Sequence, residues 1–245
     1  MPDERWLADC GVHYLLLGVE IVLVHRGRRI VLRFDRVGTV ATGAVDHGHR
    51  TTADGEAVLD HDGVVGRKGL RRRRIAEATR AELPPHIPTL DDLYATCGTG
   101  YDLSLDVKDP AAFARVLAVA AAAGDGAVGR LWLCHHDWQV VAGWRARSAD
   151  VRLVDSTRID RIKEGPERRA ATLAGAGIDA VNLHNVDWTG GLVTLFHRFD
   201  VLAFGWDAQQ PRVLAALVDM GIDGLYSDHV DRMVDAVGAA YPEAQ

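Results

Sequence analysis

Short uninterrupted runs of apolar residues recur along the chain, and longer stretches with helical spacing separate them. Runs of four or five apolar residues are typical of parallel strands that are buried on both faces. A helix is predicted over 110–123, where Asp109 precedes a proline at the first turn, as an N-cap residue does. Further helices are predicted over 167–176 and 211–220. The candidate strands are 21–24, 57–60, 103–107, 131–134, 151–154, 180–183, 201–204 and 224–227.

Alternating strands and helices indicate βα units and a parallel sheet. About eight such units in 245 residues predict an α/β fold, a (β/α)8 TIM barrel built as a single domain over residues 1–245. The alternative is an open doubly wound sheet, but no GxGxxG or GxxxxGK[ST] loop follows an early strand. A run near Asp46 brings the candidates to nine, so one of them, for which we select 180–183, is expected to lie outside the barrel.

Composition excludes several classes of protein. A net charge of −6 and a pI near 6.0 argue against a nucleic-acid partner. Three scattered cysteines without a CxxC pair indicate a reducing compartment rather than a disulfide framework or a zinc site. The apolar window 11–24 is too short to span a bilayer and contains His13 and Glu20. With no secretory signal evident, we expect a cytoplasmic protein without stable membrane insertion.

Polar side chains follow the predicted strands, at the edge where a parallel barrel carries its catalytic groups. Arginine and lysine can hold phosphate, carboxylates can hold a divalent cation, and two histidines can divide proton transfer. This combination suits phosphoryl chemistry, although many strand ends are polar only because the chain leaves the core there. The residues at these ends are His25, Arg26, His61, Asp62, Asp106, Lys108, His135, His136, His184, Trp206, Asp228 and His229.

Six motifs occur in one order along the chain: IVLVHRG, TADGEAVLDHDG, HIPTLDDLY, LSLDVK, VLAFGWDAQQP and MGIDGLYSDHVD. Together they resemble the glycerophosphodiester phosphodiesterase family, which has a TIM-barrel fold. The best match runs over 52–237, and 1–50 diverges. The resemblance implies a phosphoric diester hydrolase that releases an alcohol and glycerol 3-phosphate from a small-molecule glycerophosphodiester.

The resemblance also implies roles for particular residues. His25 and His61 are similar in position to the family's two catalytic histidines, which act as general base and acid. Arg26 and Lys108 resemble its phosphate-binding residues, and Trp206 resembles the tryptophan that lines its substrate pocket. The divalent cation, Mg²⁺ or Ca²⁺, is implied at Asp106 and Asp46, of which Asp46 stands where the family has a glutamate.

The departures lie near the amino terminus. The family has an ENT-type motif after HRG, whereas this chain has RRIVLRFDRVGTV there. The family's Glu-x-Asp metal ligands correspond to Asp46 and Gly48, so one ligand is shortened and the other is lost. Three explanations fit: a different metal shell, loss of activity, or a misread frame in the amino-terminal coding sequence. The alternative functions are a catalytically impaired barrel that binds phosphorylated ligands and a phospholipase D-like lyase that acts on lysolipids.

Two other polar stretches have simpler interpretations. The Arg-rich segment 67–74 is expected to be a solvated surface. His135, His136 and Asp137 are expected to form the loop after the fifth barrel strand, because adjacent residues on a strand point to opposite faces and cannot ligate one ion together. Cys134 is expected to be a buried, inert thiol.

Overall fold

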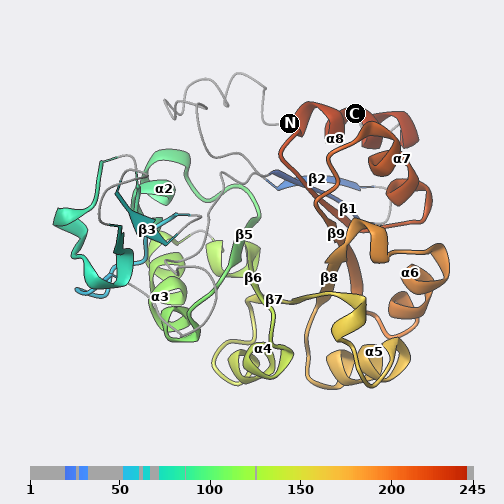
Figure 1. Ribbon diagram of the computed structural model, residues 1–245, viewed down its shortest axis with the longest axis horizontal. Coiled ribbons are helices and arrows are strands. Elements are labelled where there is room, and N and C mark those ends of the chain that lie inside the picture. Colours follow the sequence, from blue (N-terminus) through green and yellow to red (C-terminus); the bar gives the residue numbers. More distant parts are fainter. Residues whose placement is uncertain are drawn as a thin grey trace.

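The computed structural model describes residues 20–25, 28–32, 52–60, 63–66, 72–85, 87–124 and 126–241. Six parallel strands curve around a common axis, and helices α4 to α8 lie outside them (Figure 1). These strands are β5 (Leu103–Asp106), β6 (Leu131–His135), β7 (Arg152–Thr157), β8 (Ala180–His184), β9 (Leu202–Trp206) and β10 (Gly224–Ser227). The connecting helices are α3 (Phe113–Ala123), α4 (Trp138–Arg145), α5 (Pro166–Gly175), α6 (Gly190–His197), α7 (Pro211–Asp219) and α8 (Val230–Ala240).

Local sequence signals explain where the helices begin. The Asp109 side chain accepts a hydrogen bond from the backbone N–H of Ala111 at 2.9 Å, which confirms the predicted N-cap before 110–123. Asp137 caps α4 in the same way. Thr89 caps α2 (Leu90–Cys97) within a capping box that Asp92 completes. These side-chain caps therefore fix where the segment 110–123, α4 and α2 begin.

The run 180–183, which we predicted to lie outside the barrel, is one of its strands. β8 contains 180–183 and lies between β7 and β9, so the prediction that this run falls outside the barrel is wrong. The segment 57–60 forms only an isolated bridge between Val58 and Thr89. Val58 instead belongs to a small second core beside the hairpin of β3 (Val64–Val65) and β4 (Arg73–Arg74). Ala57 and Leu59 belong to the main core, so this run is buried on both sides without strand pairing and has the apolar pattern of a barrel strand.

The amino-terminal part of the described chain forms a hairpin. β1 (Glu20–His25) pairs antiparallel with β2 (Arg28–Leu32) and also antiparallel with β10, so the sheet order is β2-β1-β10-β9-β8-β7-β6-β5. Glu20 is opposite Ser227 and Leu23 is opposite Gly224. His25 therefore lies beyond the amino-terminal end of β10.

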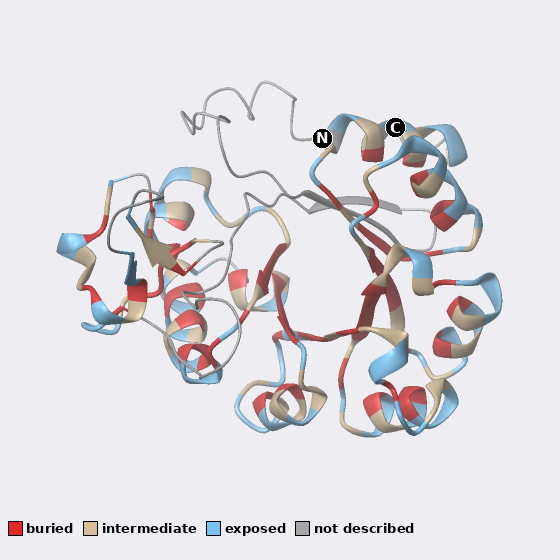
Figure 2. Cartoon of the chain, viewed as in Figure 1, coloured by how far each residue is buried: buried red, intermediate tan, exposed pale blue. Residues whose placement is uncertain are grey.

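The main core fills the barrel and the layer between strands and helices. Figure 2 shows buried residues concentrated on the strands and exposed residues on the outer helices. Phe113, Phe196 and Phe204 are fully buried. Each such side chain contributes about 1.5–3 kcal/mol through burial of apolar surface. This packing supports the polar side chains at both ends of the sheet.

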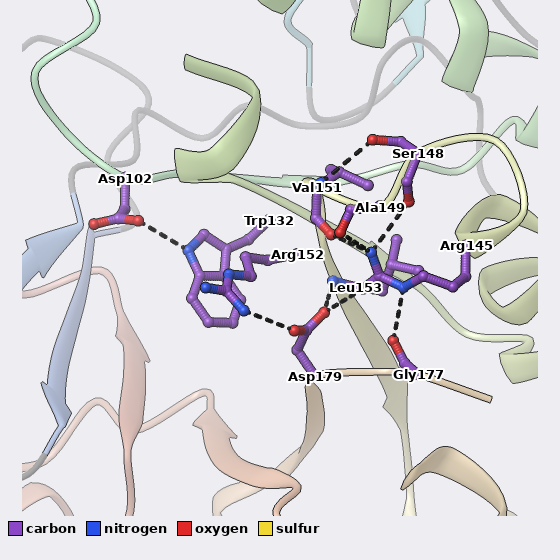
Figure 3. A network of polar contacts seen from close by, with 10 residues as sticks. All are labelled: Asp102, Trp132, Arg145, Ser148, Ala149, Val151, Arg152, Leu153, Gly177 and Asp179. Carbon is purple, nitrogen blue, oxygen red and sulfur yellow. Dashed lines mark hydrogen bonds and ion pairs between the residues drawn. The ribbon is translucent and has the colours of Figure 1, made fainter. Parts of the chain in front are cut away.

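The amino-terminal edge of the parallel strands is closed by a network of polar contacts (Figure 3). Arg145, at the end of α4, donates to the carbonyls of Gly177, Ser148, Ala149 and Val151. Its Nη2 also donates to Asp179 at 2.7 Å. These bonds tie α4 to the segments before β7 and β8. Since function in such barrels gathers at the opposite edge, we assign this network to stability.

A buried ion pair joins β7 to α5. Asp155 is fully buried, and its Oδ2 accepts a hydrogen bond from Arg169 Nη1 at 2.8 Å. Arg169 Nε donates to Glu164 at 2.6 Å, while Asp155 Oδ1 has no hydrogen-bond partner among the described residues. Burial raises the pKa of Asp155 to about 6, although Arg169 beside it favours the charged form.

The raised pKa predicts a pH-dependent stability effect. Between the ordinary pKa of 3.8 and about 6, the folded state binds more protons at Asp155 than the unfolded state, so this residue's contribution to stability falls as the pH rises. We expect the free energy of unfolding of Asp155→Asn, relative to wild type, to increase by on the order of 2 kcal/mol from pH 4 to pH 7.5. Urea unfolding of both proteins measures this difference. A difference that does not change with pH would contradict the assignment.

Candidate active site

The inner face of the barrel can be identified from contacts that cross it. Ser104 on β5 and Tyr226 on β10 are at opposite ends of the six-stranded arc, yet their hydroxyl oxygens are 3.2 Å apart. Trp132 on β6 and Phe204 on β9 have ring centroids 5.3 Å apart. These side chains must share the concave face of the sheet. Because side chains alternate along a strand, every second residue from them also points inward.

This alternation brings one set of polar residues to the inner face at the carboxyl edge. The paired strands keep the same register, with Asp106 beside Cys134, Ser156 beside Asn182 and His184 beside Trp206. The inward positions at this edge are Asp106, Arg158, His184, Trp206 and Asp228, by continuation of the alternation of their strands. They come from five of the six parallel strands, so the edge forms a ring of functional groups.

The first pair in this ring is Asp106 with Lys108. Asp106 ends β5, and its Oδ2 is bonded to Lys108 Nζ. Both side chains are nearly half exposed, at 42% for Asp106 and 46% for Lys108. Between them, Val107 is fully buried and fixes the exit of the strand. The pair therefore presents one carboxylate and one ammonium group to solvent at the carboxyl edge.

The second pair lies on β7 and the turn after β8. Arg158 follows β7 in extended conformation, and its Nε and Nη2 donate to the two carboxylate oxygens of Asp187 at 2.7 and 3.3 Å. The Asp187 side chain is only 7% exposed and also accepts the backbone N–H of Ile159 at 3.2 Å. The guanidinium carbon of Arg158 is 5.9 Å from the centre of the Trp206 ring. Hydrogen bonding to Asp187 raises the pKa of Arg158, so this group stays cationic.

The third group combines His184, Trp206 and Asp207. The His184 ring meets the Trp206 ring edge to face, with centroids 4.5 Å apart. His184 Nδ1 accepts the backbone N–H of Val186 at 3.3 Å, so we place the ring proton on Nε2, which donates to Asp207 at 3.1 Å. Both nitrogens are thus engaged, and His184 acts on the site by holding Trp206 and Asp207 in position.

Asp207 has a backbone conformation that supports this interpretation. Its φ of 61° is in the left-handed region, which residues other than glycine rarely adopt. The Asn185 side-chain amide donates to the carbonyls of Asp207 at 2.7 Å and Trp206 at 3.3 Å. These two hydrogen bonds from Asn185 hold the backbone at the end of β9 and offset the cost of the left-handed conformation of Asp207.

The two adjacent histidines behave differently from the prediction that both belong to a loop. His135 is the last residue of β6, is buried, and contacts the Trp144 ring of α4 at a centroid distance of 5.8 Å. It therefore faces outward from the barrel. Burial, and then the neighbouring His136, lower the pKa of His135. His136, with its ring centroid 4.3 Å from that of His135, lies at the next position along the chain.

The prediction that Cys134 is a buried thiol is confirmed. It is buried, and burial raises its pKa to about 12. Its sulfur lies 3.3 Å from Ser104 Oγ and 3.7 Å from Tyr226 Oη in the barrel interior. A thiol that remains protonated at neutral pH is not a nucleophile.

The structure brings together some of the predicted site residues. Asp106, Lys108 and Trp206 all lie at the carboxyl edge. His25 ends β1 at the amino edge, because β1 runs antiparallel to β10, and so it is not brought to these residues. Arg26, Asp46 and His61 lie outside the described residues. Within the described ranges, no group of three or more histidine, cysteine or acidic side chains is arranged to hold a metal ion.

Arg158 is the residue that sequence reasoning missed. The predicted strand 151–154 ended too early, whereas β7 continues to Thr157. Ser156 and Thr157 lowered the apolar character of the run, so the signal was lost. A strand extended by three residues would have placed Arg158 at the carboxyl edge, beside the other candidates.

The protein is an α/β barrel whose carboxyl edge carries Trp206 and two cations, Lys108 and Arg158, each paired with a carboxylate. A scan against protein-family models finds no match, and a search of curated proteins finds none either. None of the helices in the described part of the chain is long and apolar enough to cross a membrane.

A search of solved structures, in contrast, finds proteins with a similar fold. A Silicibacter pomeroyi protein, provisionally assigned as a glycerophosphoryl diester phosphodiesterase, matches with a TM-score of 0.67 and 22% identity over 78% of this chain and 81% of its own. A phosphodiesterase of Oleispira antarctica, solved with the product sn-glycerol-3-phosphate, has a TM-score of 0.65 and 15% identity over 76% of this chain and 81% of its own. A glycerophosphodiester phosphodiesterase of Parabacteroides distasonis has a TM-score of 0.59 and 15% identity over 77% and 81%. This chain therefore has the barrel fold of the glycerophosphodiester phosphodiesterases.

Proposed function

We propose that the chain is a phosphodiesterase that hydrolyses small glycerophosphodiesters to an alcohol and glycerol 3-phosphate. The observation that carries the proposal is the gathering of Asp106, Lys108 and Trp206 at the carboxyl edge of a barrel with this fold. The scattered cysteines and the water-soluble substrates of this class favour action in the cytoplasm.

The proposed chemistry assigns a task to each residue. Lys108 neutralises the negative oxygens of the phosphodiester, and Trp206 packs against the substrate. Arg26, which directly follows His25, joins Lys108 only if β1 runs parallel to β10 in the active enzyme. Water attacks phosphorus and the bond to the head-group oxygen breaks. A histidine removes the proton of the water and a protonated group returns one to the departing oxygen. His61 is the main candidate for this proton transfer, and His25 is its partner only if β1 runs parallel to β10 in the active enzyme.

The proposed metal site consists of Asp106 and Asp46. Carboxylate oxygens are the donors that Mg²⁺ and Ca²⁺ prefer, and Asp106 is accessible at the correct edge. Such a cation would neutralise charge on the phosphate. Among the described residues, Asp106 forms an ion pair with Lys108. Proton transfer and phosphate binding are therefore tasks of the chain's own side chains.

A second candidate function is a barrel that binds phosphorylated ligands without cleaving them. The position of His25 at the amino edge favours it, because a two-histidine mechanism needs both rings at one edge. The distinction between the two functions rests on turnover rather than on binding.

The direct test is release of glycerol 3-phosphate from glycerophosphocholine and glycerophosphoethanolamine, with Mg²⁺, with Ca²⁺ and with EDTA. We expect release with a cation and its loss with EDTA. A folded protein that binds glycerol 3-phosphate in calorimetry but releases none from either diester would support the non-cleaving barrel. A cyclic phosphate product from lysolipids would instead identify the lyase.

A further inference from the structure

We infer that Arg158 is a second anion-binding group of this site, whose guanidinium takes a negatively charged oxygen of the ligand. The inference rests on the proposed function and extends it to a residue outside the six motifs. The oxygen belongs either to the phosphodiester or to an acidic head group. The two sources share one chemistry, a planar cation that meets an anionic oxygen.

The position of Arg158 supports this inference first. Ser156, two residues earlier, accepts a hydrogen bond from Asn182 Nδ2 at 3.2 Å within the barrel, and the chain is still extended at Arg158. Arg158 therefore continues the inward-facing row of β7. It approaches the Trp206 ring from the strand two places along the sheet. Its guanidinium thus stands beside the residue proposed to contact substrate.

The guanidinium is also held in a fixed orientation. Asp187 binds its Nε and Nη2, and the Asp187 carboxylate is itself held by the Ile159 backbone N–H and has little contact with solvent. Nη1 makes no hydrogen bond to any residue that the structure describes. The Arg158 side chain is 37% exposed, so this edge can reach a ligand. A pre-oriented guanidinium loses less side-chain entropy on binding an anion than a free one does.

The position of Arg158 relative to Lys108 suits the two cations to bind one ligand together. Lys108 follows β5 and Arg158 follows β7, with β6 between them. Neighbouring strands are about 4.8 Å apart, so the two cations begin about 10 Å from one another. Both have long side chains, and the charged group of each is bonded to a carboxylate. This separation suits two anionic oxygens on one ligand, or one phosphate reached from two sides.

A purely structural ion pair is the competing interpretation. The Asp187 side chain is only 7% exposed, so its carboxylate loses a charged partner when Arg158 is replaced and stability falls under either interpretation. Only a contact between Arg158 and the ligand changes ligand affinity. Affinity therefore distinguishes the two interpretations where stability does not.

The test is calorimetric titration of Arg158→Gln and Arg158→Lys with three ligands: sn-glycerol 3-phosphate, glycerophosphocholine and glycerophosphoserine. The two diesters are titrated in a His61→Ala background so that turnover does not contribute heat. Arg161→Gln is the matched control, because Arg161 is an exposed residue of the same turn, η5 (Ile159–Arg161). Thermal melts followed by circular dichroism confirm that each variant is folded.

We expect Arg158→Gln to weaken binding of glycerol 3-phosphate about tenfold or more, the effect of one lost charge-assisted hydrogen bond. Arg158→Lys, which keeps the charge without the fork, is expected to restore part of the affinity, and Arg161→Gln to leave it unchanged. Equal losses for both diesters identify the phosphodiester as the bound group. A loss confined to glycerophosphoserine identifies the head-group carboxylate.

Two outcomes would overturn the inference. Unchanged affinity of Arg158→Gln for all three ligands shows that the pair is structural. A wild-type chain that binds none of the ligands removes this inference together with the proposed function. Wild-type binding that depends on Arg158 but occurs without turnover leaves the inference standing and ends the proposed function alone.

Discussion

Replacing His61 by alanine is expected to lower glycerol 3-phosphate release by at least about 10²-fold, while the fold is retained. A positioned general acid or base contributes about 10²–10⁴ to a rate, and the loss appears mainly in kcat. The measurement is a steady-state assay of the purified variant with glycerophosphocholine, in parallel with its circular dichroism spectrum. Wild-type turnover in a well-folded His61→Ala protein would remove His61 from the mechanism.

The matched variant is His25→Ala, which separates strand direction from motif resemblance. Since β1 runs antiparallel to β10, His25 lies at the amino edge, and we expect turnover of this variant close to that of wild type. A loss as large as that of His61→Ala would show that His25 works at the carboxyl edge and that β1 is parallel to β10 in the active enzyme. The two alanine variants together therefore test both histidines.

Replacing Asp179 by alanine is expected to reduce the free energy of unfolding by about 2–4 kcal/mol. Its carboxylate accepts hydrogen bonds from Arg145 at 2.7 Å, Arg152 at 3.0 Å and the Leu153 backbone at 2.8 Å (Figure 3). Its side chain is only 19% exposed, so the alanine variant leaves Arg145 and the Leu153 N–H without this acceptor in a poorly hydrated place. Urea unfolding at neutral pH gives the difference in free energy.

Asp150→Ala is the control for this stability prediction. Asp150 is an exposed aspartate between α4 and β7. Its replacement is expected to change the free energy of unfolding by less than about 0.5 kcal/mol. If Asp179→Ala destabilises the protein no more than Asp150→Ala does, the network at the amino edge does not stabilise the fold as proposed.

Several features of the fold could be predicted because they depend on neighbours in the chain. The N-cap at Asp109 and the helix after it follow from an aspartate, a proline and a run of alanines. Seven of the eight candidate runs are strands, since continuous Val, Ile and Leu mark burial on both faces. The error at 180–183 arose from counting strands, because a periodicity says that a segment is a strand and not where it lies in the sheet.

The site was predictable only in part. Asp106, Lys108 and Trp206 end strands that the apolar pattern marked, so their edge followed from the alternation of strands and helices. Arg158 was missed since polar Ser156 and Thr157 closed the apparent run early, although Ser156 bonds Asn182 inside the barrel and Thr157 on the other face is also buried. The buttress Asp187 lies 29 residues from Arg158 and leaves no trace in local composition.

By itself, the sequence determined the α/β class, the order of its strands and helices, and the polar residues at the strand ends. These depend on burial and capping over a few neighbouring residues. Only the tertiary structure decided the direction of β1, the outward orientation of His135 and the pairing of Arg158 with Asp187. Each depends on which strands adjoin in space, and hydrogen bonds between segments far apart in the chain determine that.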